Sequence, residues 1–254
     1  RGDLFGNQPF ANYGYWTRPG LSLEQAAEAL TALVAVSAGI AAGDAVLDVG
    51  CGYGAGAVVV SQRCAPAHIT GIDVTDIRID EGQHYIARHG LAERVTLQRG
   101  NATAMDFADA RFDKLMSVEC AFHFDTRRKF LDEAARVLKP GGTLALTDMI
   151  PRHGIDPTDY LRGEKTVNSG VVLDNPGNAY DADVYAAHLA AAGFTDIRIE
   201  SILPWTRQRF VEALGAVAAK AGGEKGAAVR RSAERIQQII DGGEDYVLVV
   251  ARKA

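Results

Sequence analysis

The chain has 254 residues, of which 47% are hydrophobic and 23% are charged, a composition typical of a soluble globular protein with a sizeable core. Its net charge of −5 argues against a nucleic-acid partner, which favours a basic surface. No apolar run approaches the roughly 20 residues that span a bilayer, and no signal-peptide pattern is present, although the chain begins at Arg1. The three cysteines show no metal-type spacing, so we expect a reduced, cytoplasmic setting without membrane insertion.

Short β-branched runs alternate with helical patterns from Ala45 to about Ile150, and turn residues bound the runs. The helical pattern after residue 125 is clear, and the stretch KPGG at 139–142 ends it. This alternation predicts an α/β fold of the Rossmann-like type: a doubly wound, mostly parallel seven-stranded sheet with helical cap or lid inserts. The expected strands are 45–50, 68–74, 94–100, 112–118, 143–149, 196–202 and 245–254.

A glycine-rich turn follows the first expected strand: Asp48 precedes glycines at positions 50, 52 and 54. Glycines let the backbone turn sharply and approach a ligand closely, and the following helix offers free N–H groups. Asp73 ends the next strand, at the place from which a carboxylate accepts hydrogen bonds from both hydroxyls of a ribose. The spacing G-x-G-x-G differs from the G-x-G-x-x-G of dinucleotide-binding folds. The sequence therefore predicts a nucleoside site at this turn.

Residues 46–149 resemble the class I S-adenosylmethionine (SAM)-dependent methyltransferases, whose motifs appear in order as LDVGCGYG, GIDVT, GNATAMDF followed by RFD, and VLKPGG. The resemblance implies SAM as the cofactor and S-adenosylhomocysteine (SAH) as its product. It implies that Asp48 orders the loop and reaches the methionine amine through water, and that Asp73 holds the ribose. The glycines that it places against the nucleoside and the methionine moiety are Gly50, Gly52 and Gly54.

Further cofactor-binding residues follow from the resemblance. Asn101 stands where the family usually has an aspartate that accepts from the adenine amino group, and Ala102 follows it. Glu119 is expected on the methionine side. The stretch FANYGYWTRPG is similar to the aromatic N-terminal segment of small-molecule O-methyltransferases, which folds over the methionine end of the cofactor. A ring face attracts the cationic sulfur, and the candidate rings are Tyr13 first, then Tyr15 and Trp16.

One histidine, His123, lies just beyond the fourth expected strand, and Asp148 lies at the tip of the fifth. Adjacent parallel strands stand about 4.8 Å apart, so the two side chains are expected to meet over one pocket. An imidazole suits proton abstraction near neutral pH, and a carboxylate orients its ring. The segment is similar to natural-product O-methyltransferases of the rebeccamycin sugar type, in which a histidine and an aspartate here are linked to deprotonating a hydroxyl. Relatives often have two consecutive histidines, where this chain has Phe122-His123.

Several alternatives stay open around this segment. His123 is either the base or a packed residue between Phe122 and Phe124. Cys120 has no clear activating partner, so packing is expected for it. No metal is expected, because metal-dependent methylation needs an acidic cluster and the sequence offers only Asp125 with Asp148 as a candidate. The basic run DTRRKF at 125–130 is balanced by nearby acids, so a solvated helix start is expected there.

Two inserts, 150–178 and 204–243, follow strand ends and are expected to be lids or substrate walls beside the ligand crevice. The Ala-rich stretch 209–222 within the second is either a hydrophobic wall or a contact in a homo-oligomer. The other expected divisions are 1–44, an aromatic segment and helix over the cofactor; 45–149, the SAM-binding core; and 179–203 with 244–254, the C-terminal part of the sheet.

The sequence predicts a SAM-dependent methyltransferase that moves a methyl group to a hydroxyl of a small natural-product-like acceptor, with His123 as general base assisted by Asp148. One alternative keeps SAM but methylates an alkene carbon of an isoprenoid or lipid. A site for the resulting carbocation would need aromatic rings and a carboxylate around it. A further alternative is a cyclase-like or non-methylating member that keeps the SAM site.

Overall fold

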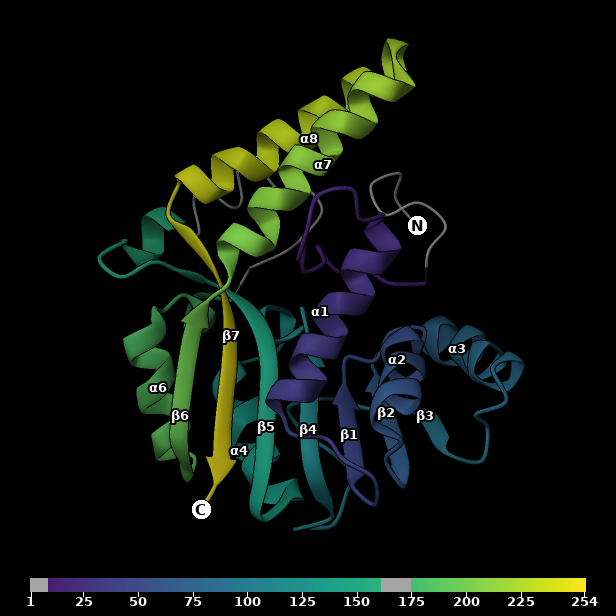
Figure 1. Cartoon of the computed structure of the whole chain (residues 1–254). Coiled ribbons are helices and arrows are strands. Elements are labelled where there is room, and N and C mark those ends of the chain that lie inside the picture. Colours follow the sequence, from purple (N-terminus) through teal and green to yellow (C-terminus); the bar gives the residue numbers. More distant parts are fainter. Residues whose placement is uncertain (1–8, 161–174) are drawn as a thin grey trace.

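The computed structural model describes residues 9–160 and 175–254, and its centre is one twisted sheet of seven strands (Figure 1). The strands are β1 (Ala45–Val49), β2 (His68–Asp73), β3 (Val95–Arg99), β4 (Phe112–Val118), β5 (Leu138–Pro151), β6 (Phe194–Ser201) and β7 (Glu244–Lys253). Their order is β3-β2-β1-β4-β5-β7-β6. β7 runs antiparallel to both of its neighbours, and the other pairings are parallel. The expected fold class is therefore confirmed.

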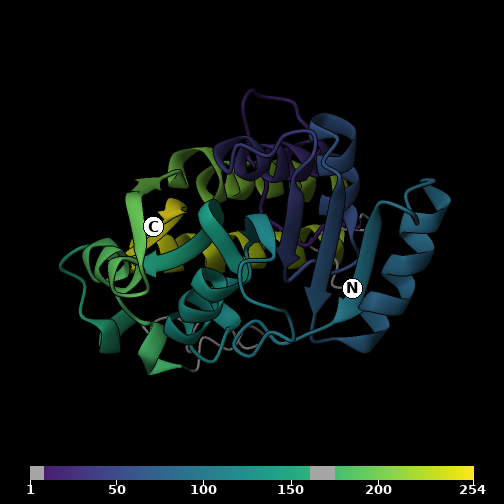
Figure 2. The same cartoon turned by 90° about the horizontal axis from the view of Figure 1, so that it is seen from below.

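Helices cover both faces of this sheet, as the view from below in Figure 2 shows. They are α1 (Leu23–Ser37), α2 (Ala55–Cys64), α3 (Asp76–Arg88), α4 (Arg127–Val137), α6 (Ala182–Ala191), α7 (Arg207–Ala221) and α8 (Gly223–Asp241). Buried residues of α1, α2 and α3 share a hydrophobic cluster with one face of the sheet, and those of α4 and α6 share a second cluster with the other face. Because both faces are covered, the strands read as nearly continuous apolar runs.

Neighbouring residues on a strand pack into opposite clusters. On β1, Val46 belongs to the cluster under α1 and Leu47 to the cluster under α4. On β4, Met116 belongs to the cluster under α1 and Leu115 to the cluster under α4. This period of two follows from the pleat, which points successive side chains to opposite faces. The core thus holds the strands in a register that determines which side chains reach the strand ends.

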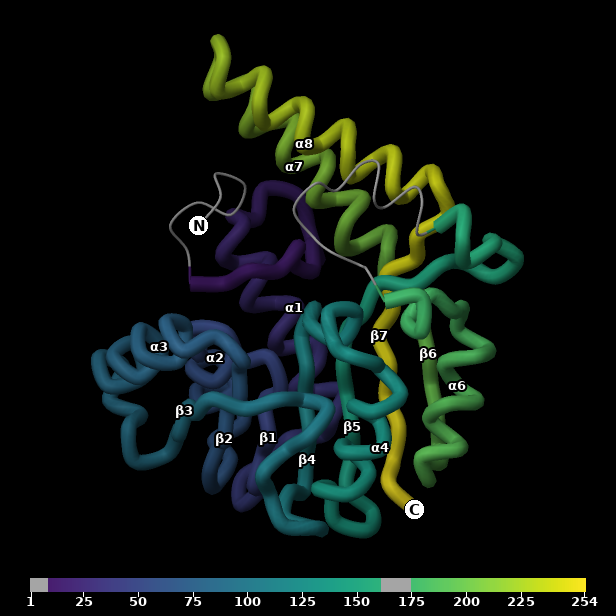
Figure 3. The backbone as a smooth tube through the Cα atoms, turned by 180° about the vertical axis from the view of Figure 1, so that it is seen from behind, coloured from purple at the N-terminus to yellow at the C-terminus, as the bar shows by residue number. Residues whose placement is uncertain are grey.

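The chain reverses direction across the sheet between β1 and β4, because β2 and β3 lie on one side of β1 and the later strands on the other. In open α/β sheets, ligands bind outside the carboxyl ends of the strands at such a point. α7 and α8 pack on each other and project from this edge of the sheet, and the N-terminal segment crosses the same edge (Figures 1 and 3). The edge is therefore the place to look for a site.

Most of the expected elements are confirmed, with small differences at their ends. The helix α4 ends at Val137 rather than at the KPGG stretch, because Leu138 already pairs with Phe112 in the sheet. Residues 204–243 form mainly α7 and α8, which join at Gly222. Residues 161–174 of the expected insert 150–178, and residues 1–8 of the N-terminal segment, lie outside the described residues. None of the helices in the described ranges is long and apolar enough to cross a membrane.

Candidate active site

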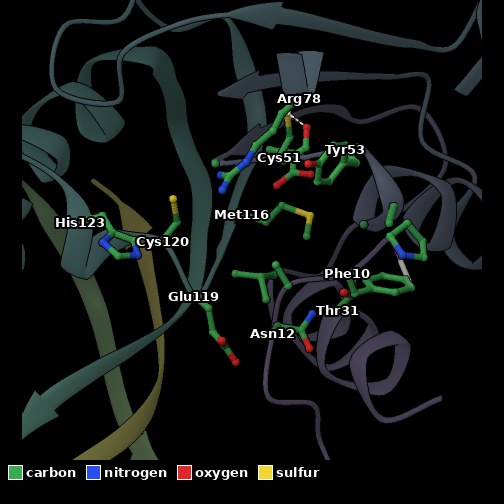
Figure 4. Close-up of a pocket in the computed structure, with 18 residues that line it drawn as sticks. Phe10, Asn12, Thr31, Cys51, Tyr53, Arg78, Met116, Glu119, Cys120 and His123 are labelled. Atoms are coloured by element: carbon green, nitrogen blue, oxygen red, sulfur yellow. Dashed lines mark hydrogen bonds between the residues drawn. The ribbon is translucent and has the colours of Figure 1, made fainter. Parts of the chain in front are cut away.

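Two adjoining pockets open at the carboxyl ends of β1, β2 and β4. The first lies between the glycine turn after β1, the N-terminal segment and the end of β4, as Figure 4 shows. The second lies between the ends of β2 and β3 and residues 123–125. Four residues line both pockets, so the two form one continuous cleft: Gly50, Arg78, Cys120 and His123. The cleft lies where the topology of the sheet predicts a ligand.

The glycine turn leaves the backbone free to approach a ligand. Gly50, Gly52 and Gly54 have φ angles of 79°, 54° and 75°, in the left-handed region that glycine adopts at little cost. Gly50 and Gly52 line the cleft, and a Cβ at position 50 would lie 2.2 Å from the Cys120 sulfur. Gly54 is not among the described lining residues. It precedes α2, and a Cβ there would lie 2.8 Å from Leu97, so its role is close packing.

Two buried carboxylates stand at the ends of β1 and β2. Asp73 accepts hydrogen bonds from the N–H groups of Gly52 (3.1 Å) and Thr75 (2.9 Å), with the Arg78 guanidinium 3.6 Å away. Asp48 is 4% exposed and lines the first pocket. Burial, and next the charge of Asp73, raise the pKa of Asp48 to about 7. A buried acid that faces a cleft in this way suits a cationic group of a ligand, because a nearby positive charge favours the ionised form.

The second pocket contains the residues expected beside an adenine. Asn101 and Ala102 both line it. The side-chain carbonyl of Asn101 accepts hydrogen bonds from the N–H and the hydroxyl of Thr103, both at 2.9 Å. The atom that was expected to accept from the adenine amino group therefore already has two donors. Its part in adenine binding stays a prediction.

Glu119 ties the N-terminal segment to the end of β4. Its carboxylate accepts hydrogen bonds from the Tyr13 N–H at 2.7 Å and the Tyr246 hydroxyl at 2.6 Å, and burial raises the pKa of Glu119 to about 7. The Tyr13 ring, which was expected to face the cofactor, instead lies 4.7 Å from the Arg207 guanidinium and 5.0 Å from the Phe210 ring. The described part of the N-terminal segment lines the first pocket with residues that the sequence did not single out, Pro9, Phe10, Ala11 and Asn12.

His123 is exposed at the junction of the two pockets. It ends the short helix η1 (Ala121–His123), directly after β4, and its ring lies 4.1 Å from the Phe122 ring, centroid to centroid. Figure 4 shows the imidazole across the pocket from Phe10 and Thr31. Phe122 rather than His123 is the packed residue, at 5% exposed. Partial burial, and next the charge of Arg78, lower the pKa of His123 below 6.5, so that the imidazole is neutral at pH 7.

Asp148 does not meet His123 in this structure. Its carboxylate is fully buried and is not among the described residues that line the cleft. It forms an ion pair with Arg127, whose Nε lies 2.6 Å from Oδ2, and accepts hydrogen bonds from the Tyr185 hydroxyl at 3.1 Å and the Met149 N–H at 2.9 Å. The direct contact expected from strand spacing was wrong, because Asp148 is held on the α4 side of the sheet by these partners.

The partner of Asp148 comes from the basic run at 125–130. This run was expected to be a solvated helix start, yet Arg127 is only 2% exposed, while Arg128 and Lys129 are exposed. A second buried ion pair joins Arg207 to Glu244. The partners are 21 and 37 positions apart in the two pairs. No local sequence pattern signals contacts of that separation, so neither pair was expected.

Two other groups bear on the chemistry of the cleft. Burial raises the pKa of the Cys120 thiol to about 12, so the thiol stays protonated and suits packing rather than nucleophilic attack. Within residues 9–160 and 175–254, one cluster has the donors to hold a metal ion, namely His153, Asp181 and Asp183. Its members do not line the cleft in the described ranges.

Comparisons with known proteins place this cleft in a family. A family model described as a methyltransferase domain matches residues 47–146. Erythromycin 3''-O-methyltransferase of Saccharopolyspora erythraea is 34% identical over 200 residues, which cover 76% of this chain and 64% of that protein. The match therefore spans less than two thirds of this relative. The 27-O-demethylrifamycin SV methyltransferase of Amycolatopsis mediterranei is 31% identical over 207 residues, which cover 80% of this chain and 72% of that protein.

A solved structure agrees over nearly the whole chain. The structure of the [4+2]-cyclase SpnF matches with a TM-score of 0.75 and 29% identity, covering 96% of this chain and 88% of that one. The cleft itself fits SAM, because the buried Asp48 faces the first pocket and Asp73 faces the second. The chain belongs to the class I SAM-dependent methyltransferases, in the branch of small-molecule natural-product O-methyltransferases, and its cofactor is SAM.

Proposed function

We propose that the protein methylates a hydroxyl group of a small natural-product-like acceptor and that His123 takes up the hydroxyl proton. SAM supplies an electrophilic methyl group on a positively charged sulfur when it is bound. The protein must then hold the acceptor oxygen in line, exclude water and remove one proton. Positioning contributes on the order of 7–11 kcal/mol to such reactions, and a placed base adds roughly 10²–10⁴-fold.

The observation that carries this proposal is the place and state of His123. The imidazole is exposed at the junction of the two pockets, so it adjoins both the methionine side and the nucleoside side of the expected cofactor. A lowered pKa keeps it unprotonated at neutral pH. A neutral imidazole accepts the hydroxyl proton as the oxygen attacks the methyl carbon, and it later loses that proton to water.

The other residues of the cleft bind and orient. Asp48 pairs with the amine of the methionine moiety, and both Asp73 and the backbone at Gly50 and Gly52 hold the nucleoside. Glu119 keeps the N-terminal segment over the first pocket through the Tyr13 N–H, so that residues 9–12 cover the methionine end. In this role the N-terminal segment excludes water from the reacting atoms.

A His123→Ala variant tests the role of the base. Turnover should fall by about 10²–10⁴-fold and recover in part at high pH, where more of the acceptor hydroxyl is ionised. Binding of SAH, measured by calorimetry, should stay within about twofold of the wild type, because SAH carries no reacting methyl group. Suitable acceptors are 27-O-demethylrifamycin SV and erythromycin that lacks the 3''-O-methyl group, since two relatives act at these positions.

The matched control is His84→Ala, because His84 is exposed on α3 and hydrogen-bonds only within that helix. It should keep full turnover. An equally active His123→Ala enzyme would remove His123 from the mechanism. Release of SAH with none of these acceptors, nor with a panel of glycosides, polyketides and phenols, would contradict O-methylation and favour the non-methylating alternative.

The carbocation alternative is less well supported by the cleft. Of the rings suggested for it, Phe122 and Trp16 are buried in the core, and the Tyr13 ring faces Arg207. Phe124 lines the second pocket, and Glu119 lines the first. An alkene-methylating enzyme would lose most activity in Glu119→Gln and little in His123→Ala, the reverse of the pattern expected here.

A further inference from the structure

We propose that Asn178 positions His123 and that Arg127 and Asp148 hold Asn178 in place for this purpose. The inference rests on the proposed function, in which His123 is the base. Asn178 lies at the end of the short helix η2 (Pro176–Asn178) and is 5% exposed. We call Asp148, Arg127 and Asn178 together the brace.

The side-chain amide of Asn178 spans the backbone on both sides of His123. Its Nδ2 donates hydrogen bonds to the carbonyl oxygen of Phe124 at 2.8 Å and to that of Phe122 at 3.4 Å. In residues 9–160 and 175–254, no side chain hydrogen-bonds the His123 imidazole, which only packs on the Phe122 ring. The backbone on either side of His123 is therefore the main restraint on the direction of the imidazole.

Arg127 holds Asn178 from the other side. The Arg127 N–H donates to Asn178 Oδ1 at 2.8 Å, and the Arg127 guanidinium donates to the Asn178 carbonyl oxygen. Since Oδ1 accepts from Arg127, the Nδ2 group must face the two carbonyls, and the orientation of the amide follows from its partners alone. Every side-chain polar atom of Asn178 thus has a partner in a buried site, where an unpaired one is costly.

Asp148 in turn determines where the Arg127 guanidinium lies. The ion pair at 2.6 Å is joined by a hydrogen bond from Arg127 Nη2 to the Met149 carbonyl, also at 2.6 Å. The rings of Tyr180 and Tyr185 lie 5.2 and 5.7 Å from the guanidinium carbon and enclose it. Asp148 therefore reaches His123 indirectly, through the brace. This accounts for an aspartate at the tip of β5 without any contact to the imidazole.

A base must be held within a fraction of an ångström of its substrate, and a misplacement of about 1 Å can cost about 10²-fold in rate. The two hydrogen bonds from Asn178 provide this restraint from a side chain that is not among the described residues lining the cleft. Asn178 is accordingly a positioning residue, and its loss should act through His123.

The test uses Asn178→Ala, with Asn175→Ala as the matched control. Asn175 belongs to the same turn and is half-buried, but its side chain bonds to Asp125 and the Gly177 N–H rather than to the carbonyls beside His123. If Asn178→Ala does not fold, Asn178→Asp replaces it, because a carboxylate keeps the shape and the acceptor for the Arg127 N–H but cannot donate to the two carbonyls.

The first readout needs no acceptor. The Cε1–H signals of the six histidines are followed by NMR against pH in the ligand-free protein, and the His123 signal is identified by its loss in His123→Ala. The pKa of His123 should rise toward 6.5 in Asn178→Ala, because a loosened segment lets more water reach the partly buried ring. In Asn175→Ala the pKa of His123 should be the same as in the wild type. An unchanged titration in folded Asn178→Ala would overturn the inference.

The second readout is a double-mutant cycle on turnover with 27-O-demethylrifamycin SV. In the wild-type background, Asn178→Ala should lower kcat by about tenfold or more and change the KM for SAM by less than about twofold. In the His123→Ala background, the same substitution should change the residual rate by less than about twofold, because its target is already gone. An equal fall in both backgrounds would show a general structural role and contradict the inference.

The two proposals fail in different ways. If His123→Ala keeps full turnover, the proposed function loses its base, while the NMR titration still decides whether Asn178 orients the ring. If His123→Ala is inactive and Asn178→Ala is fully active, the base stands and the positioning role of Asn178 is refuted.

Discussion

At the scale of single residues, three acids near the ends of neighbouring strands differ in what they face. Asp148 has the guanidinium of Arg127 at 2.6 Å. No cation in the described part of the chain pairs with Asp48, and burial raises its pKa to about 7. Glu119 has no ion pair at such a distance but accepts two hydrogen bonds, and burial raises its pKa to about 7 as well. Burial raises the pKa of Asp148 as well, although Arg127 opposes it, so the pKa direction does not separate the three acids. Their places do: Asp48 and Glu119 line the cleft, whereas Asp148 supports the structure behind it.

The raised pKa of Asp48 predicts a pH-dependent affinity for SAH. Only the carboxylate form attracts the ligand amine, so affinity should fall by on the order of tenfold as the pH falls from 8 to 6 and Asp48 takes up a proton. Calorimetry across this range measures it. Asp48→Asn should bind weakly and with little pH dependence, and His123→Ala should retain the dependence of the wild type. A dependence that survives in Asp48→Asn would assign it to another group.

The glycine turn predicts two substitutions of unequal cost. Gly50→Ala places a Cβ 2.2 Å from the Cys120 sulfur, whereas a Cβ in Gly52→Ala has no atom of the described residues within 4 Å. Both positions have a left-handed φ, which costs an alanine about 1–2 kcal/mol. Gly52→Ala should lose about that amount of unfolding free energy, and Gly50→Ala at least about 1–3 kcal/mol more, because the overlap forces a shift. Chemical denaturation compares the two variants, and equal losses would contradict the contact with Cys120.

At the scale of elements, the N-terminal segment is tied to three separate parts of the fold. The Tyr13 N–H donates to Glu119 after β4, the Tyr15 N–H to Ala26 of α1 at 2.8 Å, and the Trp16 N–H to Trp205 before α7 at 2.7 Å. Residues 13–16 are therefore held by three partners that lie far apart in the sequence. Of these ties, only the one to Glu119 ends on a group that titrates.

The raised pKa of Glu119 predicts how the free energy of unfolding depends on pH. Glu119 has an ordinary pKa of 4.5 and a folded pKa of about 7, so the folded protein binds the proton more tightly than the unfolded chain. Its contribution is present below pH 4.5 and is lost as the pH rises toward 7. The stability of the wild type relative to Glu119→Gln should thus fall by on the order of 1–3 kcal/mol between pH 4.5 and 7.5. Denaturation of both ligand-free proteins measures the difference, which cancels the similar contribution of Asp48.

At the scale of the whole molecule, the sequence predicted the features that depend on residues close together in the chain. Alternating strands and helices implied the sheet, and the turn from Asp48 to Gly54 implied a nucleoside site at its edge. Arg127 shows the limit, because a basic run beside acids is typical of a solvated helix start. The burial of Arg127 depends on Asp148, which lies on β5, and on the rings of Tyr180 and Tyr185, which lie before and on α6.

The expectations for the active site were likewise met where they depended on local sequence and not where they depended on distant contacts. His123 lies at the cleft, because the end of a strand determines its place in the fold. The direction of the Asp148 side chain could not be derived from strand spacing, since it depends on which cation is packed beside it. Asn178 carried no signal in the sequence, because a lone asparagine after a proline and a glycine is typical of an ordinary turn.

The position of Asn178 has a consequence for redesign of acceptor choice. The insert expected at 150–178 is the stretch to exchange between relatives, and Asn178 is its last residue. A graft that stops before Asn175 would leave the amide beside the His123 backbone untouched. One that runs through Asn178 would replace the residue that we propose to position His123, and we expect such a chimera to lose rate with every acceptor alike. The two grafts differ only at residues 175–178, so comparing their rates would isolate the contribution of this short turn.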